Sequence, residues 1–248
     1  MGWILRRNGL MAAVVVLSYG LIGAPALVDR PEAAVAQSQP AVISWTQIRD
    51  WFQRKKVRGG RRNPLFCAIA PQLLQDDSFL AGTTPVEVWH LRPLFVWRGQ
   101  IGAAGRLEVF QYDANQLLWN RPISSLNTSL LYPSLLYQGS ALKPGQTYKW
   151  RVSSHENPNL PSIYSTILFQ VVAAPKWQQM ATELSQLSAQ LKTQAATDET
   201  IAFRRASYFA ERQLWSDVLQ EVMGVPQPSS QLTQLRQDLT DQICGVRQ

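Results

Sequence analysis

The sequence of 248 residues predicts an all-β sandwich followed by a small α-helical bundle. Two observations indicate this fold class. Between Val86 and Val172, short runs with apolar residues at every second position are separated by turn residues, as expected for about seven strands in two sheets. From Trp177 onward, apolar residues recur at the three- and four-residue spacing of amphipathic helices. A small barrel is the alternative arrangement of the strands.

A Pro-Gly turn precedes the strand around which the sandwich is expected to form. Pro144 presets φ for a turn, and Gly145 can take a positive φ. The spacing L-x-P-G-x-x-Y, from Leu142 to Tyr148, resembles the tyrosine corner of immunoglobulin-like and fibronectin-III-like sandwiches. The resemblance implies that the Tyr148 hydroxyl bonds to the backbone a few residues upstream. An ordinary Pro-Gly turn before a strand is the alternative.

The N-terminal segment is typical of an export signal. Two arginines precede an apolar run from Leu10 to Val28, and small residues follow, so cleavage is expected after Ala36. Residues 1–36 are therefore assigned to a signal peptide, and the rest of the chain to the periplasm or the extracellular space. The alternative is an uncleaved N-terminal helix that anchors the protein, because the run is just long enough to cross a bilayer.

Residues 37–66 are expected to form a linker and a basic amphipathic arm. A short helix beginning near Ser44 would place the apolar residues between Trp45 and Phe52 on one side. Six cations follow without an acid, and the rest of the mature chain has no net charge, which argues against specific nucleic-acid binding. The arm could bind an anionic membrane surface or an acidic partner; the alternative is a helix packed on the sandwich and a solvated basic loop. The six cations are Arg54, Lys55, Lys56, Arg58, Arg61 and Arg62.

The sandwich is assigned to residues 67–174. Trp97 and Trp150 share the parity of their apolar neighbours, which favours a place in the core. Pro133 favours an edge strand or a bend. The expected strands are residues 86–88, 92–97, 106–112, 116–120, 130–132 with 135–137, 148–153 and 166–172.

Residues 175–248 are assigned to a bundle of about four helices, each too short to be stable alone. Gly224 followed by Pro226 should end the third helix. The candidate N-caps are Thr197 or Asp198 for the second helix, and Ser229 or Ser230 for the fourth.

Cys67 and Cys244 stand at opposite ends of the mature chain. Export permits a disulfide between them. Two unrelated buried thiols are the alternative, because nothing in the sequence brings the two Cα atoms within the required range of about 4.4–6.8 Å.

Two further resemblances concern larger parts of the chain. The pattern from Ala206 to Leu219, A-x-x-F-A followed by L-W-x-x-V-L, resembles one tetratricopeptide helix pair. The order of parts over residues 54–225 resembles a family of exported cyanobacterial proteins of unknown function. The shared motifs are an Arg-Gly-rich segment ending in Cys67, R-P-x-x-x-W, and L-x-P-G-x-x-Y-x-W. The resemblance implies architecture and compartment but no activity. Residues 152–155 lack the second cysteine that the family carries shortly after its corner tyrosine.

No motif for a catalytic, cofactor-binding or metal site is recognised. The two histidines, His90 and His155, have no metal-ligand spacing, and His90 is expected to be structural. The adjacent carboxylates of Asp76 and Asp77 would point to opposite sides of an extended chain and make a poor acid–base pair.

The sequence therefore predicts a non-enzymatic exported binding or scaffold module of the cell envelope with a protein or envelope partner and no cofactor. Its basic arm would attract anionic surfaces. One alternative is a carbohydrate-binding module, and another is an unrecognised envelope hydrolase. The carbohydrate reading requires exposed sandwich aromatics from the set Trp89, Trp97, Trp119 and Trp150.

Overall fold

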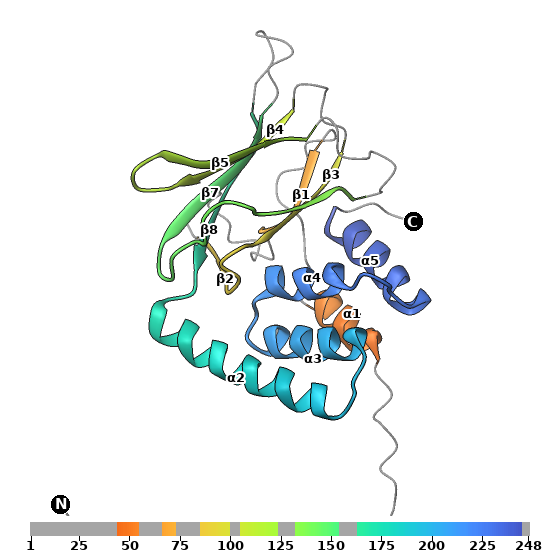
Figure 1. Ribbon diagram of the computed structural model, residues 1–248. Coiled ribbons are helices and arrows are strands. Elements are labelled where there is room, and N and C mark those ends of the chain that lie inside the picture. Colours follow the sequence, from red (N-terminus) through yellow and green to blue (C-terminus); the bar gives the residue numbers. More distant parts are fainter. Residues whose placement is uncertain are drawn as a thin grey trace, which may run out of the picture. The chain divides into compact units, whose positions relative to one another are not determined.

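The computed structural model describes residues 44–54, 66–72, 85–99, 105–123, 132–153 and 163–244, all within one compact unit (Figure 1). The expected signal peptide and the basic residues from Lys55 to Arg62 lie outside these ranges, as does the side chain of Arg54. Among the described residues, no helix has the length and hydropathy of a membrane span. The elements are α1 (Trp45–Arg54), β1 (Phe66–Ala70), β2 (Val86–Val88), β3 (Leu94–Gly99), β4 (Arg106–Gln111), β5 (Gln116–Pro122), β6 (Ser134–Leu136), β7 (Thr147–Ser153), β8 (Ile163–Val171), α2 (Ala174–Thr193), α3 (Asp198–Glu211), α4 (Trp215–Gly224) and α5 (Ser230–Ile243).

The described strands form two sheets. The smaller sheet has the antiparallel order β1-β3-β6, and the larger has the order β2-β8-β7-β4-β5, in which β2 runs parallel to β8. Both sheets contribute to the core between them, where the rings of Phe95 and Trp150 lie 5.2 Å apart. The predicted order of two sheets followed by helices is confirmed. One strand, β1, has no counterpart among the strands expected from the sequence.

The helices form a third layer against the smaller sheet. Along β3, Phe95 and Trp97 enter the core between the sheets, whereas Leu94 and Val96 pack into the helical core on the other face. Ile69 of β1 also faces the helices. Strands β1 and β3 of the smaller sheet are therefore covered on both faces, and Figure 1 shows the helices together on one side of the sheets. Helix α2 begins at Ala174, and the helices that follow pack on the sandwich.

Helix α1 forms where the sequence predicts it, yet it belongs to the helical layer. Its residues Trp45, Ile48 and Phe52 are buried there, and the Trp45 ring meets Phe203 of α3 edge to face at 5.1 Å. The Trp45 indole also donates a hydrogen bond of 2.8 Å to Glu199. This corrects the amphipathic-arm interpretation for residues 45–54, because the apolar face of α1 is occupied inside the protein. It packs mainly against α3 and α5, in a buried core that also contains Ile69 of β1 and Val96 of β3.

Side-chain caps fix the starts of two C-terminal helices. Thr197 accepts a hydrogen bond from the Thr200 N–H at the start of α3, and Ser229 accepts one from the Leu232 N–H at the start of α5. In each case the first of the two candidate residues is the cap. The carboxylate of Glu199 then accepts hydrogen bonds from the N–H and the hydroxyl of Ser229 at 2.8 and 2.7 Å, which ties α3 to α5.

Candidate functional site at the junction of sheets and helices

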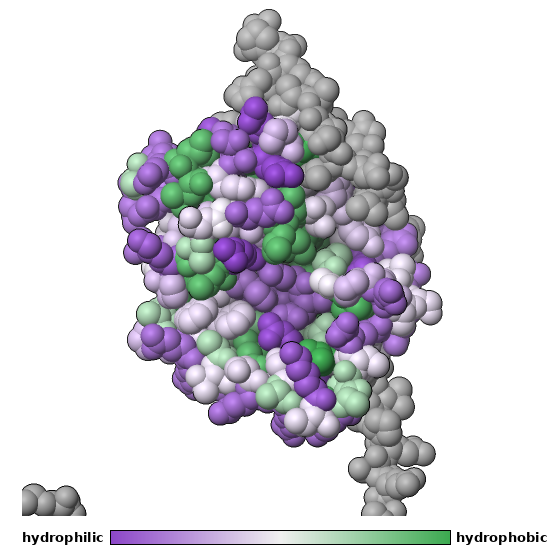
Figure 2. Space-filling view, in the orientation of Figure 1, coloured by the Kyte–Doolittle hydropathy of each residue, from purple (hydrophilic) through white to green (hydrophobic). Residues whose placement is uncertain are grey.

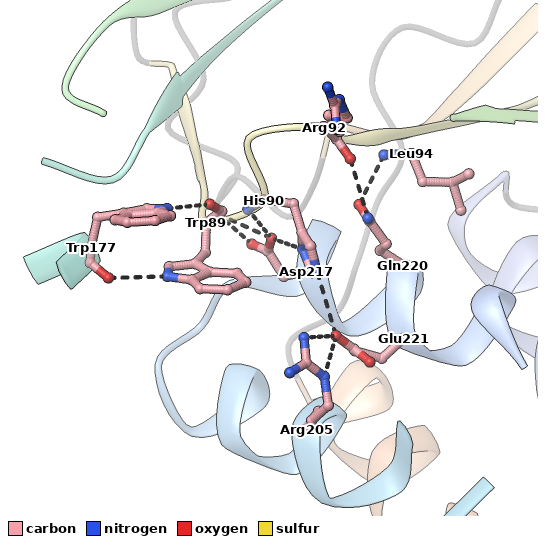
Figure 3. A network of polar contacts seen from close by, with 9 residues as sticks. All are labelled: Trp89, His90, Arg92, Leu94, Trp177, Arg205, Asp217, Gln220 and Glu221. Atoms are coloured by element: carbon pink, nitrogen blue, oxygen red, sulfur yellow. Dashed lines mark hydrogen bonds and ion pairs between the residues drawn. The ribbon is translucent and has the colours of Figure 1, made fainter. Parts of the chain in front are cut away.

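Helix α4 holds the chain segment between β2 and β3 with three polar side chains. Asp217, Gln220 and Glu221 are spaced i, i+3 and i+4, so they share one helix face, and Figure 3 shows all three directed at residues 89–94. Gln220 accepts a hydrogen bond of 2.9 Å from the Leu94 N–H and donates one of 3.2 Å to the Arg92 carbonyl. The first residue of β3 is therefore fixed by a side chain of the helical layer.

Asp217 is a buried carboxylate with 1 % of its surface exposed. It accepts hydrogen bonds from the Trp89 N–H at 2.9 and 3.0 Å and from the His90 N–H at 2.9 Å. It lies in the first turn of α4, where the helix dipole favours a negative charge. These donors compensate the cost of burying the charge.

The His90 imidazole lies between two carboxylates (Figure 3). Its Nδ1 is 2.6 Å from Asp217 Oδ1, and its Nε2 is 3.4 Å from Glu221 Oε1. Burial by itself lowers the pKa of His90, but the hydrogen bonds and charges of Asp217 and Glu221 outweigh it and raise the pKa from 6.5 to about 9. His90 is therefore an imidazolium at neutral pH.

Arg205 of α3 ends the chain of charges. Its guanidinium bonds Glu221 Oε1 at 2.8 and 2.9 Å. Burial alone would raise the pKa of the Glu221 carboxyl, but its contacts with His90 and Arg205 lower it. Four charges of alternating sign thus connect α4, the β2–β3 segment and α3.

Two tryptophans close the other side of the junction. The Trp89 and Trp177 rings are stacked with centroids 5.7 Å apart. Each indole N–H donates to the backbone carbonyl of the other residue, at 3.3 Å from Trp89 and 2.9 Å from Trp177. This reciprocal pair attaches the start of α2 to the end of β2.

A shallow cavity of about 240 Å³ opens beside the ion pair of Arg205 and Glu221. Its lining is mostly apolar, and its residues Arg205 and Glu221 already pair with each other. The lining residues are Asp198, Ile201, Ala202, Arg205, Glu221, Gly224, Val225 and Pro226.

A histidine beside two carboxylates also occurs in catalytic sites, but the contacts of these side chains here are those of a structural site. Each ring nitrogen of His90 contacts a carboxylate, and neither contact is with a hydroxyl or a thiol. A charged imidazole is also a poor general base at neutral pH. Within the described residues, no group of three or more His, Cys, Asp or Glu residues could hold a metal ion. The arrangement locks the helices onto the sheets.

The tyrosine corner predicted from Leu142, Pro144, Gly145 and Tyr148 has the expected hydrogen bond. The Tyr148 hydroxyl accepts it from the Lys143 N–H at 2.8 Å. Gly145 has a φ of +80°, which is the reason for glycine in this turn. Burial raises the pKa of the Tyr148 phenol, and the bond from Lys143 partly offsets this. The corner fixes the entry into β7.

Cys67 and Cys244 form a disulfide with their Cα atoms 5.9 Å apart, across a sequence separation of 177. The bond joins β1 to the residue that ends α5. Of the two alternatives left open by the sequence, the structure has the bridge.

The other candidate site residues from the sequence either lie in the core or fall outside the residues that the structure describes. Trp97 and Trp150 are buried at 2 % and 0 % exposure, and Trp119 is partly buried against Phe95 and Tyr137, so these three do not form a stacking face for sugars. The basic residues from Lys55 to Arg62, His155 and the Asp76-Asp77 pair lie outside the described residues.

The sequence interpretation missed Asp217, Gln220 and Glu221. Their spacing on one helix face was a visible signal, but such a polar stripe beside apolar Val218 and Leu219 is the ordinary pattern of a solvated face.

Comparison of the chain with models of protein families, with curated proteins and with solved structures finds no match.

Proposed function

We propose that the chain is an exported, non-enzymatic binding module of the cell envelope that presents a protein-interaction surface at one edge of its sandwich. The supporting observation is the place of its exposed large apolar side chains. All four that occur among the described residues belong to the β4–β5 hairpin or to β6: Tyr112, Leu117, Leu118 and Leu136, at 46, 43, 36 and 43 % exposure. We call these four residues the apolar edge.

The strands that carry the apolar edge lie on the same side of the sandwich. β5 is the last strand of the larger sheet and β6 the last of the smaller one. The rings of Trp119 on β5 and Tyr137 after β6 are 5.3 Å apart, and Arg121 donates to Gln138 at 3.5 Å. In Figure 2, hydrophobic residues gather over the part of the molecule where Figure 1 places β5. Large exposed apolar patches mark interaction sites.

The finer parts of the proposal concern fold and compartment. The strand orders β1-β3-β6 and β8-β7-β4-β5, with the tyrosine corner entering β7, support an immunoglobulin-like or fibronectin-III-like sandwich. The α3–α4 pair supports a single tetratricopeptide-like hairpin. The resemblance to exported cyanobacterial proteins supports the envelope location, and the six cations of the basic arm would attract an anionic surface or partner.

A photocrosslinking experiment in the exporting cell tests the function. The crosslinking amino acid p-benzoylphenylalanine replaces Tyr112 in the apolar edge, or Arg204, an exposed residue of α3, as the control. We expect an adduct with a discrete partner from the Tyr112 position and none from the Arg204 position. Equal adducts at both positions, or adducts at neither, would contradict the proposal. Hydrolysis of envelope substrates by purified residues 37–248 would also overturn it.

A further inference from the structure

We infer that β5 accepts an extended acidic peptide segment of another protein as an additional strand of the larger sheet. This inference rests on the proposed function and names the partner's chemistry. It depends on three observations: the open edge of β5, the apolar side chains beside it, and nearby cations that have no acidic partner in the described part of the chain.

The edge of β5 is open within the described residues. Its seven residues pair with β4 on one side, and no described strand pairs with the other. Of these residues only Trp119 is partly buried, and the other six are exposed. A strand edge presents a row of N–H and C=O groups that another extended chain can pair with.

Apolar side chains supply the second component of recognition. Leu117 and Leu118 belong to β5 itself, and Leu136 belongs to the neighbouring edge strand β6. An added strand has side chains that alternate between the two faces of the sheet, so apolar residues on one of its faces could cover one of the two consecutive leucines of β5. Burial of apolar surface here would add to the backbone hydrogen bonds.

Three cations around β5 have only neutral partners among the residues that the structure describes. Arg106 donates to Asn120 at 3.1 Å, Arg121 to Gln138 at 3.5 Å, and Lys149 to Asn115 at 2.5 Å. Elsewhere in the described chain, side-chain cations commonly pair with carboxylates, as Arg151 does with Glu108 at 2.7 Å and Arg205 with Glu221 at 2.8 Å. These three side chains therefore remain available to carboxylates from outside.

The charge balance selects the occupant. β4, β5, their turn and β7 carry four cations and two acids, and one of the acids, Glu108, is already paired with Arg151. A second copy of the chain would bring the same excess of cations to the same edge, and β5 itself contains no acid. Like charges brought together across an interface oppose association, whereas an acidic segment is attracted. The occupant is therefore an acidic peptide, not a second β5.

The test uses purified residues 37–248 and a fluorescein-labelled heptapeptide in which glutamate and valine alternate, matched in length to β5. A peptide with lysine in place of glutamate is the control ligand. We expect fluorescence anisotropy to detect binding of the glutamate peptide and not of the lysine peptide. The double change Arg121→Glu with Lys149→Glu should weaken binding about tenfold or more, because attraction becomes repulsion.

A matched variant controls for the loss of net charge. Lys192→Glu with Arg204→Glu reverses two exposed cations on α2 and α3, and should leave the affinity within about twofold, a change of less than about 0.5 kcal/mol. Thermal unfolding of both variants would show that each is folded. Hydrogen exchange should locate the site by added protection of the backbone amides of residues 116–121.

Each other outcome overturns the inference. These outcomes are the absence of binding, equal binding of the lysine peptide, an equal loss in the control variant, or protection outside β5. A dimer of the free chain that the Arg121→Glu and Lys149→Glu changes disrupt would identify a second copy as the occupant. If Tyr112 crosslinks to a partner but the peptide does not bind, the binding module stands and strand addition fails. If neither occurs, both proposals fail.

Discussion

The carboxylate of Asp217 lies 2.6 Å from the Nδ1 atom of His90, although the two residues are 127 positions apart in the chain. This contact joins the first turn of α4 to the segment after β2, and the N–H groups of Trp89 and His90 complete the coordination of the carboxylate. The helical layer is thus attached to the sandwich through charge as well as through apolar packing. Loss of the contact between Asp217 and His90 should therefore lower the free energy of unfolding of the whole protein.

Asp217→Asn should lower the free energy of unfolding by about 3–5 kcal/mol, because a buried ion pair that loses one partner leaves the other uncompensated. An amide also has only one oxygen to accept the backbone N–H groups that Asp217 now holds. Urea denaturation at pH 7 measures the change. The control is Asp238→Asn, which removes a partly exposed pair with Arg49 at 3.7 Å and should cost less than about 1 kcal/mol. Equal costs would mean that the junction is no stronger than a surface pair.

Stability should fall as the pH rises from 7 to 10. The pKa of His90 is raised from 6.5 to about 9 in the folded protein, so its stabilising contribution is fully present below pH 6.5 and is lost as the pH rises through 9. At 1.36 kcal/mol for each pH unit, the full contribution is on the order of 3 kcal/mol. Urea denaturation at several pH values measures it. His90→Gln should flatten this dependence; a variant that keeps the wild-type slope would assign it to other groups.

Tyr148→Phe should lower the free energy of unfolding by about 1–3 kcal/mol, because the Lys143 N–H loses the hydroxyl that accepts its hydrogen bond. Thermal and urea unfolding report the change. Tyr112→Phe is the matched control, since Tyr112 is 46 % exposed, and it should change stability by less than about 0.5 kcal/mol. If Tyr148→Phe left the free energy of unfolding unchanged, the Pro-Gly turn would be stable without the hydrogen bond to the tyrosine hydroxyl.

Removal of the disulfide should lower the free energy of unfolding by about 2–5 kcal/mol, because the bridge restricts the unfolded chain. Cys67→Ser and Cys244→Ser should lower the free energy of unfolding by similar amounts. The double variant should be no less stable than the less stable of the two single variants. Denaturation of the variants and of the wild type with and without reductant measures this. Strictly additive losses would show that the two thiols act independently.

The sequence was most informative where a local rule determines the structure. The Pro144-Gly145 turn, the alternation before and after it, and the caps Thr197 and Ser229 each depend on residues within one element, and the structure agrees with them. The order of sheets and helices follows from the same local periodicities. The placement of Trp97 and Trp150 in the core followed from their parity with apolar neighbours.

The junction could not be predicted because its contacts join distant parts of the chain. Asp217 in a first helical turn has an ordinary local explanation in the helix dipole, and His90 beside a strand has none that points to α4. The strand β1 was missed because its five residues are too few to show a period, and it is buried on both faces. The pairing of Cys67 with Cys244 likewise required the position of α5 against β1.

Both faces of β3 are covered by apolar residues, so hydrophobicity alone does not fix the alignment of this strand. In a strand with one wet face, a slip of one residue would expose the apolar set, and that penalty selects the correct pairing. In β3, a slip would merely exchange the side of Phe95 and Trp97 for that of Leu94 and Val96. The side-chain amide of Gln220 bonds both the Leu94 N–H and the Arg92 carbonyl. It therefore fixes the residue at which this strand begins.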